Sequence, residues 1–366
     1  ASRGLGDVYK RQMRAVRYYG QKDIRVEEID APVAGKGEVL IDVAWCGICG
    51  TDLHEYLEGP IFCPKPGHPH PITGEEPPVT LGHEFSGVVA ALGEGVDDLE
   101  VGQHVVVEPY VLPDDVDPKE PGPYNLHPDV NFIGLAGGGG GLSEKIAVQR
   151  RWVHPINNDV PLDEAALIEP LSVAHHAFVA SEAKEGDVAL IGGAGPIGVL
   201  TAAVAKAYGL TVIVSELSEL RRQKALDAGV ADYAIDPSAT DLKAEVDKIT
   251  DGKGVDVAFE CTSVNVVLDQ LIDCLKLKGT LVVESIWSKK AELDIHALVM
   301  KELTIRGIIG YAHDHPQTIK LVESGKIDLK PFITGKIGFD GVVDEGFDTL
   351  INRNETAVKI LVSPEL

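Results

Sequence analysis

Two segments in the early part of the chain carry side chains that could bind a metal ion. One reads Cys46-Gly-Ile-Cys49-Gly-Thr-Asp-Leu-His54, and the other is Gly82-His83-Glu84. A single Cys-x-x-Cys pair is half of a zinc knuckle or a redox pair, and the sequence has no second pair to close a structural zinc site. Catalytic zinc needs only three protein ligands, which a thiolate, an imidazole and a carboxylate from distant segments can supply. The residue types therefore favour catalytic zinc.

A glycine pattern in the middle of the chain predicts a dinucleotide site. The run Gly193-Ala-Gly195-Pro196-Ile197-Gly198 follows an apolar, strand-like stretch and opens a helical one, which is the context that this motif requires. Its glycines permit a tight turn, a close approach of the backbone to a pyrophosphate, and close packing of helix on strand. Free N–H groups at the helix N-terminus then face the phosphates, and Pro196 is favourable in the first helical turn.

Residues at the ends of the strands that follow this motif predict which dinucleotide binds and where its nicotinamide lies. Glu216 stands at the end of the second predicted strand, where its carboxylate can accept hydrogen bonds from an adenosine ribose. A 2′-phosphate would meet a negative charge there, so NAD is favoured over NADP, although Arg221 could tolerate a phosphate. The nicotinamide is expected at the strand ends that contain Thr262 and Ser285, because open parallel sheets bind ligands there. The alternative is a structural glycine turn with a solvated Glu216.

Composition excludes several classes of protein. The 366 residues carry a net charge of −24, with 44% hydrophobic and 5% aromatic residues. This charge repels phosphate backbones and anionic lipid, so we expect no nucleic-acid and no membrane partner. No window approaches the ~18 consecutive apolar residues of a membrane span. Five cysteines, an odd number, do not form a disulfide framework in a chain of this length. A cytoplasmic location is expected.

Apolar patterning predicts two kinds of structure. Up to about residue 153, short strand-like runs alternate with Gly and Pro, which is typical of a β-rich, barrel-like unit. From residue 188 to 284, apolar strands alternate with amphipathic helices, which is typical of a doubly wound parallel sheet. We therefore predict an α/β protein with a β-rich catalytic domain of residues 13–165 and 305–366, interrupted by a dinucleotide-binding domain of residues 166–304.

Residues 1–12 are predicted to be a non-native or disordered leader. They carry no apolar periodicity, and the run Asp7–Gln12 resembles a translated sequencing adapter. Met13 looks like the true start, so removal of the preceding residues is expected to leave activity unchanged.

Together these motifs resemble the zinc-dependent medium-chain alcohol dehydrogenases. The resemblance is carried by residues 47–54, by Gly82-His83-Glu84, by Glu169-Pro-Leu and by the glycine pattern, and it covers nearly the whole chain from Met13. It implies a GroES-like barrel domain and a Rossmann-type domain. Within the superfamily, residues 54–60, 166–173 and 218–224 are most similar to 2,3-butanediol dehydrogenases, with sorbitol dehydrogenases next.

The resemblance also implies a metal-binding role for several residues. Cys49 and His83 would bind the catalytic zinc, with Glu169 as third ligand. Glu84 would approach the metal when substrate or water leaves, and Asp52 would orient His83. Because Glu169 stands at a predicted helix start, its carboxylate could instead complement the helix dipole.

The proton path is implied in the same way. Thr51 matches the family's hydroxyl that receives the alcohol proton, and His54 matches the histidine that passes this proton to solvent through the cofactor ribose. Only its spacing from Cys49 supports His54, which could instead be a surface histidine.

One segment departs from the family pattern. Many members carry four cysteines that bind a structural zinc, and the positions that match them here are Pro113, Val116, Lys119 and His127. A lone histidine cannot close a tetrahedral site. We therefore predict one catalytic zinc per subunit and no structural zinc, and we expect residues 111–121 to be mobile or held by proline stiffness alone.

These inferences predict an NAD- and zinc-dependent oxidoreductase that interconverts a secondary alcohol or vicinal diol and its ketone, with 2,3-butanediol and acetoin as the leading pair. A sorbitol or polyol dehydrogenase is the alternative within the class, and a non-catalytic NAD-binding protein is the alternative outside it. The family resemblance suggests a homodimer or homotetramer. The apolar run 280–283 is a candidate edge strand for pairing with a second copy.

Overall fold

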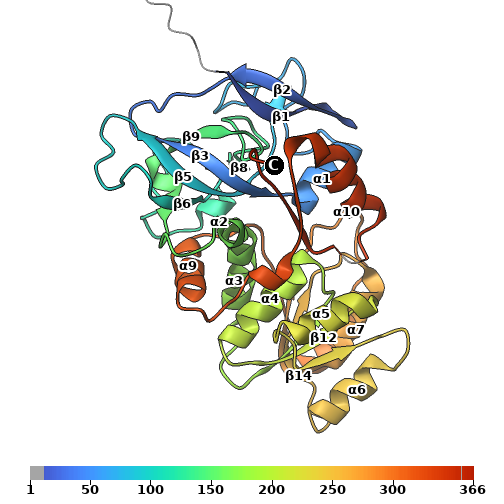
Figure 1. Ribbon diagram of the computed structural model, residues 1–366. Coiled ribbons are helices and arrows are strands. Elements are labelled where there is room, and N and C mark those ends of the chain that lie inside the picture. The colour runs from blue at the N-terminus through green and yellow to red at the C-terminus, as the bar shows by residue number, and fades with distance from the viewer. Residues whose placement is uncertain (1–11, 356) are drawn as a thin grey trace, which may run out of the picture.

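In the computed structural model of the protein, residues 12–355 and 357–366 are described. Figure 1 shows a β-rich part above and a part with a parallel sheet and covering helices below. Most of the predicted leader lies outside the described residues. Gln12, which we assigned to the leader, is the first residue of β1, and its side chain donates a hydrogen bond to Asp30 at 2.7 Å.

The β-rich part is built on two larger sheets. A seven-stranded sheet has the order β10-β6-β5-β3-β18-β17, with β9 pairing with β3, and a three-stranded sheet has the order β2-β1-β4. Because β17 and β18 come from the end of the chain, the C-terminal segment returns to the first sheet. The strands are β1 (Gln12–Gly20), β2 (Asp23–Asp30), β3 (Glu38–Gly47), β4 (Val79–Thr80), β5 (Glu84–Leu92), β6 (His104–Val107), β7 (Tyr110–Val111), β8 (Asn131–Phe132), β9 (Lys145–Gln149), β10 (Val153–Pro155), β17 (Ile333–Ile337) and β18 (Lys359–Val362). The helices are α1 (Gly50–Glu58), α2 (Leu162–Ala165), α9 (His315–Glu323) and α10 (Asp348–Asn352).

The second part is a six-stranded parallel sheet of order β13-β12-β11-β14-β15-β16. In chain order this is 3-2-1-4-5-6, the doubly wound arrangement of dinucleotide-binding folds. The strands are β11 (Val188–Gly192), β12 (Thr211–Ser215), β13 (Tyr233–Ile235), β14 (Val255–Glu260), β15 (Leu275–Val283) and β16 (Thr304–Gly307). The helices are α3 (Ile168–Ser181), α4 (Pro196–Ala207), α5 (Glu219–Asp227), α6 (Leu242–Ile249), α7 (Asn265–Cys274) and α8 (Ile295–Lys301). The domain boundary at 304 stays a prediction, and β16 continues the sheet to Gly307.

The predicted edge strand is wrong. Residues 280–283 lie in β15, which is paired on both sides, with β14 and with β16. The sheet ends at β16 instead. The prediction failed because strand order depends on the crossover connections, whereas an apolar run reads alike in an edge and an interior strand.

Residues 111–121 are held by more than proline stiffness, so that part of the expectation is wrong, while the mobility of the segment stays a prediction. The guanidinium of Arg151 donates hydrogen bonds to the backbone carbonyls of Leu112 at 3.2 Å, Pro113 at 3.1 Å and Asp114 at 3.0 Å, and to that of Val116. The Arg151 side chain therefore binds four backbone carbonyls of a segment that has little regular structure.

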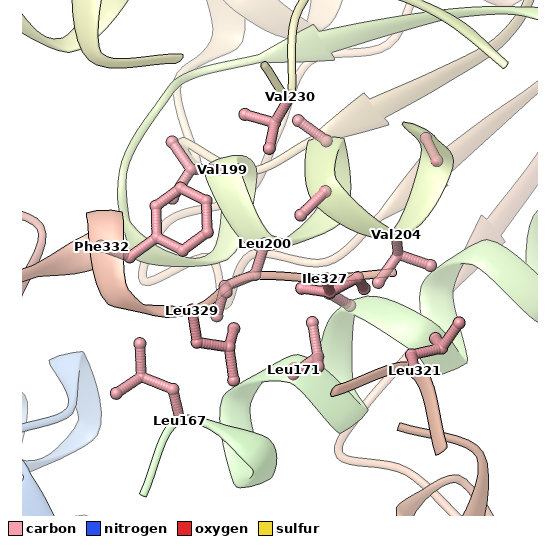
Figure 2. Close-up of a cluster of buried hydrophobic side chains, with 14 of the residues drawn as sticks. Leu167, Leu171, Val199, Leu200, Val204, Val230, Leu321, Ile327, Leu329 and Phe332 are labelled. Carbon is pink, nitrogen blue, oxygen red and sulfur yellow. The ribbon is translucent and has the colours of Figure 1, made fainter. Parts of the chain in front are cut away.

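A continuous apolar core joins the two parts. Figure 2 shows Leu171 of α3, Leu200 of α4 and Phe332 of the C-terminal segment pointing toward a shared cluster. Full burial of side chains of this size stabilises a fold by about 1.5–3 kcal/mol each. Because α3 contributes to this core, the first turn of α3 is fixed relative to both sheets. No helix among the described residues is both long and apolar enough to cross a bilayer.

Candidate active site

Three possible metal ligands meet where β3, α1 and β5 come together. Cys49 is the N-cap of α1, His83 directly precedes β5, and Glu84 is the first residue of β5. One ligand atom from each of the three lies within 4.8 Å of the others. The antiparallel register of β3 and β5 pairs Gly47 with Glu84, which places Glu84 beside the turn that carries Cys49. A set of sulfur, nitrogen and oxygen donors fits zinc.

Asp52 lies behind this group, in the first turn of α1, and is completely buried. Its Oδ2 accepts a hydrogen bond from the backbone N–H of Cys49 at 2.9 Å, and its Oδ1 faces Nδ1 of His83 at 3.6 Å. The other ring nitrogen of His83, Nε2, is left for a metal. Burial opposes a charge on His83, yet Asp52 and Cys49 raise its pKa well above the ordinary value. This geometry is consistent with the orienting role predicted for Asp52.

Glu84 has a second partner that the sequence did not reveal. Both of its carboxylate oxygens accept hydrogen bonds from the Lys359 ammonium, at 2.8 and 2.7 Å, and both side chains are buried. Burial opposes a charge on Lys359, but Glu84 raises its pKa. A Cβ at Gly47 would lie 2.2 Å from Oε2 of Glu84, so only glycine permits this approach. Glu84 is therefore an ion-pair partner of Lys359 as well as a neighbour of Cys49 and His83.

Glu169 stands apart from the group of three. It lies in the first turn of α3, nearly buried, and the hydroxyl of Tyr311 donates a hydrogen bond to its Oε1 at 2.7 Å. Burial and the nearby Glu84 raise the pKa of Glu169 to about 7. Its assignment as third zinc ligand stays a prediction.

Thr51 and His54 lie three residues apart on α1 and thus on one side of the helix. The hydroxyl oxygen of Thr51 is 3.7 Å from the sulfur of Cys49, while His54 is exposed. A hydroxyl beside the metal-binding thiol and an imidazole at the surface one turn away agree with the predicted proton path, which stays a prediction.

The glycine turn has the geometry that the motif predicts. Gly193 has φ +97°, which favours glycine, and a Cβ at Gly198 would lie 2.0 Å from the carbonyl oxygen of Gly193. By contrast, a Cβ at Gly195 would meet nothing within 4 Å, so the backbone there is open to a ligand. Pro196 begins α4, followed by Ile197, and the helix N-terminus points its free N–H groups toward this space.

Glu216 lies beside that turn. Its carboxylate accepts hydrogen bonds from the backbone N–H of Ala194 at 2.8 Å and of Ser218 at 2.9 Å. The guanidinium of Arg221 lies 4.0 Å from the Glu216 carboxylate and donates to the carbonyl oxygens of Asn354 and Ala357 at 2.5 and 3.4 Å. Glu216 thus lies beside the glycine turn, and Arg221 connects it to the C-terminal segment; the role of Glu216 at the adenosine ribose stays a prediction.

Comparison with known proteins identifies the family of the chain. Residues 35–158 match the alcohol dehydrogenase GroES-like domain, and residues 196–324 match the zinc-binding dehydrogenase family. Over 354 residues the chain is 64% identical to an (R,R)-butanediol dehydrogenase of Neisseria gonorrhoeae, an alignment that covers 97% of this chain and 100% of the relative. The chain belongs to the zinc-binding alcohol dehydrogenases.

Solved structures of other dehydrogenases extend the comparison. The crystal structure of 2R,3R-butanediol dehydrogenase from Bacillus subtilis superposes with a TM-score of 0.90 at 45% identity, covering 96% of this chain and 99% of that one. An Escherichia coli CFT073 alcohol dehydrogenase complexed with NADH superposes with a TM-score of 0.83 at 28% identity, covering 96% and 99%. The predicted family, fold class, enzyme class and cofactors, zinc and NAD, are confirmed.

Two residues of this alcohol dehydrogenase site were missed from the sequence. Lys359 and Tyr311 contact Glu84 and Glu169 across separations of 275 and 142 residues. Lys359 lies in the apolar run of β18, and a charged residue at such a position is a signal for a buried partner. No local pattern marks Tyr311.

Proposed function

We propose that this alcohol dehydrogenase interconverts 2,3-butanediol and acetoin with NAD as the redox cofactor. The observation that carries this proposal is the 64% identity with the Neisseria gonorrhoeae enzyme over nearly the full length of both chains. Because that enzyme is named for the (R,R) isomer, we propose (2R,3R)-butanediol as the preferred diol.

Cys49 and His83 would hold the zinc, with a carboxylate from Glu169 or Glu84 completing the set. When bound, zinc makes a hydroxyl group more acidic and, in the reverse reaction, polarises a ketone. Tyr311 occupies Oε1 of Glu169, which leaves Oε2 as the oxygen free to turn toward the metal. The ion pair with Lys359 offsets the negative charge of Glu84 beside the Cys49 thiolate.

Thr51 would take the proton of the alcohol, and His54 would pass it to solvent. The support is the position of the Thr51 hydroxyl beside Cys49 and the exposure of His54 one turn along α1. The chemistry that NAD would supply when bound is that of a hydride acceptor. The glycine turn and Glu216 would hold its pyrophosphate and adenosine ribose.

The function is tested by following reduced nicotinamide with each butanediol stereoisomer and with sorbitol. We expect turnover with (2R,3R)-butanediol, loss of turnover after a chelator, and recovery when zinc is restored. Higher turnover with sorbitol would favour a polyol dehydrogenase, and no chelator-sensitive signal with any of these substrates would favour a binding protein.

Elemental analysis should give one zinc per chain, and a second zinc would contradict the predicted absence of a structural ion.

We further propose a homodimer formed through β16. The support is that β16 ends the parallel sheet and that α8, which precedes it, exposes Ile295, Val299 and Met300 at 59%, 66% and 65%. An unpaired strand edge beside an exposed apolar helix face is suited to a second copy. A tetramer would need a further interface.

We propose a cytoplasmic location for the enzyme. All five cysteines lie among the described residues and are free thiols, which suits a reducing compartment.

A further inference from the structure

Glu260 is a completely buried carboxylate at the ligand-binding edge of the parallel sheet. It is the last residue of β14, and the register places it opposite Gly192 of β11 on one side and Val283 of β15 on the other. Gly192 directly precedes the glycine turn. Glu260 therefore lies at the carboxyl ends of the central strands, where doubly wound sheets bind their ligands.

The carboxylate of Glu260 accepts five hydrogen bonds from two different loops. Oε1 accepts from the N–H and the hydroxyl of Thr262, both at 2.6 Å, and from the N–H of Ser263 at 2.9 Å. Oε2 accepts from the hydroxyl of Ser285 and from the indole N–H of Trp287 at 3.1 Å. An ionised carboxylate has about four lone-pair sites, more than any neutral side chain, so a carboxylate suits a cluster of donors of this size. One side chain thus connects the loop after β14 with the loop after β15.

The loop after β14 borders the cofactor turn, and the loop after β15 contacts the loop after β14. A Cβ at Gly193 would lie 2.6 Å from the methyl group of Thr262, so Thr262 packs against the first glycine of the motif. Ser263 has φ +56°, a conformation that residues other than glycine seldom adopt, and its N–H also lies 3.1 Å from the Ser285 hydroxyl. The hydrogen bond from Ser263 to Glu260 holds the loop in this uncommon conformation.

We propose that Glu260 is a positioning residue for the nicotinamide half of the NAD site, acting through the loops of Thr262 and Ser285. This inference rests on the use of NAD in the proposed function and is independent of the identity of the alcohol. The adenosine half would be held by different elements, namely Glu216 and the start of α5. Loss of the Glu260 carboxylate should therefore weaken NAD binding while sparing ligands that carry only adenosine and a phosphate.

A second buried carboxylate provides a matched control. Glu284 directly follows β15, close to Glu260, but it accepts only from the Thr201 hydroxyl at 2.9 Å and from the Cys261 thiol at 3.8 Å. Burial raises the pKa of Glu284 to about 8, so it is largely neutral near pH 7 and glutamine is a close replacement.

The experiment compares the zinc-loaded Glu260→Gln and Glu284→Gln variants with the parent, using calorimetric titration of NAD and of AMP in the absence of substrate. For Glu260→Gln we expect roughly tenfold weaker NAD binding, because hydrogen bonds to a charged acceptor are lost, and AMP binding that changes less than about twofold. For Glu284→Gln we expect both affinities to stay near those of the parent. Zinc content should be unchanged in both variants.

Equal losses of NAD and AMP affinity in Glu260→Gln would overturn the proposal, because they would indicate a general structural role, and so would unaltered NAD affinity. If this variant fails to fold, Ser285→Ala decides, since it removes one donor and leaves the carboxylate in place. We expect a roughly two- to fivefold loss of NAD affinity there, and no loss would overturn the proposal. Absence of NAD binding to the parent protein would instead overturn the proposed function.

Discussion

At the scale of single residues, the two cysteines of the Cys-x-x-Cys pair differ in their surroundings. Cys49 is partly exposed and faces His83 and Glu84, whereas Cys46 is fully buried in the apolar core. Burial raises the pKa of the Cys46 thiol well above its ordinary value, so Cys46 stays a neutral thiol, and only a thiolate is a good zinc ligand. The structure thus separates a candidate ligand from a core residue within one short motif.

We predict that Cys49→Ala loses both zinc and turnover. The loss of zinc affinity should exceed the roughly 10–100-fold that removal of a ligand's hydrogen-bonding partner costs, because a direct donor is removed. Elemental analysis and the NAD-reduction assay measure the two effects, with Cys46→Ala as the matched control that keeps its zinc. A Cys49→Ala protein that retained stoichiometric zinc would show that the ligand set is different.

Glu216 is the residue that we expect to discriminate between NAD and NADP. Its replacement by alanine removes a charged acceptor, so NAD affinity should fall by roughly 10–100-fold. The preference over NADP should shrink as well, because the repulsion of a 2′-phosphate is lost. Titration of both cofactors measures the effect, with Asp227→Ala, exposed at the far end of α5, as control. An unchanged ratio of the two affinities would count against this role.

At the scale of elements, Arg151 organises the segment that replaces the metal-binding lobe of other family members. Arg151→Lys should loosen residues 112–116, since an ammonium offers fewer donors in a less rigid arrangement than a guanidinium. We expect faster amide hydrogen exchange in this segment and about 1–3 kcal/mol lower stability. Arg150→Lys is the control, because Arg150 pairs with Asp98 instead. Equal exchange rates in the two variants would contradict the assignment.

Glu284, which directly follows β15, should make the free energy of unfolding of the protein depend on pH. Burial raises the pKa of Glu284 to about 8 in the folded chain, from an ordinary value of 4.5. The folded state therefore binds a proton that the unfolded state releases, and the contribution of Glu284 to the free energy of unfolding falls as the pH rises through this window. The slope is at most about 1.4 kcal/mol per pH unit.

Glu284→Gln removes this titration. The stability of the variant relative to the parent should therefore improve as the pH rises from about 6 to about 8.5. Urea unfolding at these two pH values measures the difference. A difference that stays constant with pH would show that Glu284 does not keep its proton in the folded chain.

At the scale of the whole molecule, the proposed dimer depends on the apolar face beside β16. Ile295 and Val299 are four residues apart and share one side of α8. Aspartate at both positions should shift sedimentation velocity from dimer toward monomer, because charges would have to be buried at the interface. Val33→Asp is the control, since Val33 is 84% exposed between β2 and β3. A doubly substituted protein that remained dimeric would exclude this face.

The sequence by itself determined the features that depend on neighbours along the chain. The glycine turn, its strand and helix, Glu216 at the next strand end and the α/β alternation are all local patterns, because backbone conformation and periodicity are set over a few residues. The resemblance to the family added the candidate zinc ligands Cys49 and His83 for the same reason, since both lie in short motifs.

Only the tertiary structure decided the partners of the buried charges and the order of the strands. The Lys359–Glu84 ion pair, the Tyr311–Glu169 hydrogen bond and the five donors around Glu260 join residues that the sequence separates or that no motif marks. Strand order placed β16 rather than β15 at the edge. A buried charge requires a partner but does not specify which one, because long-range pairing is set by how the elements pack.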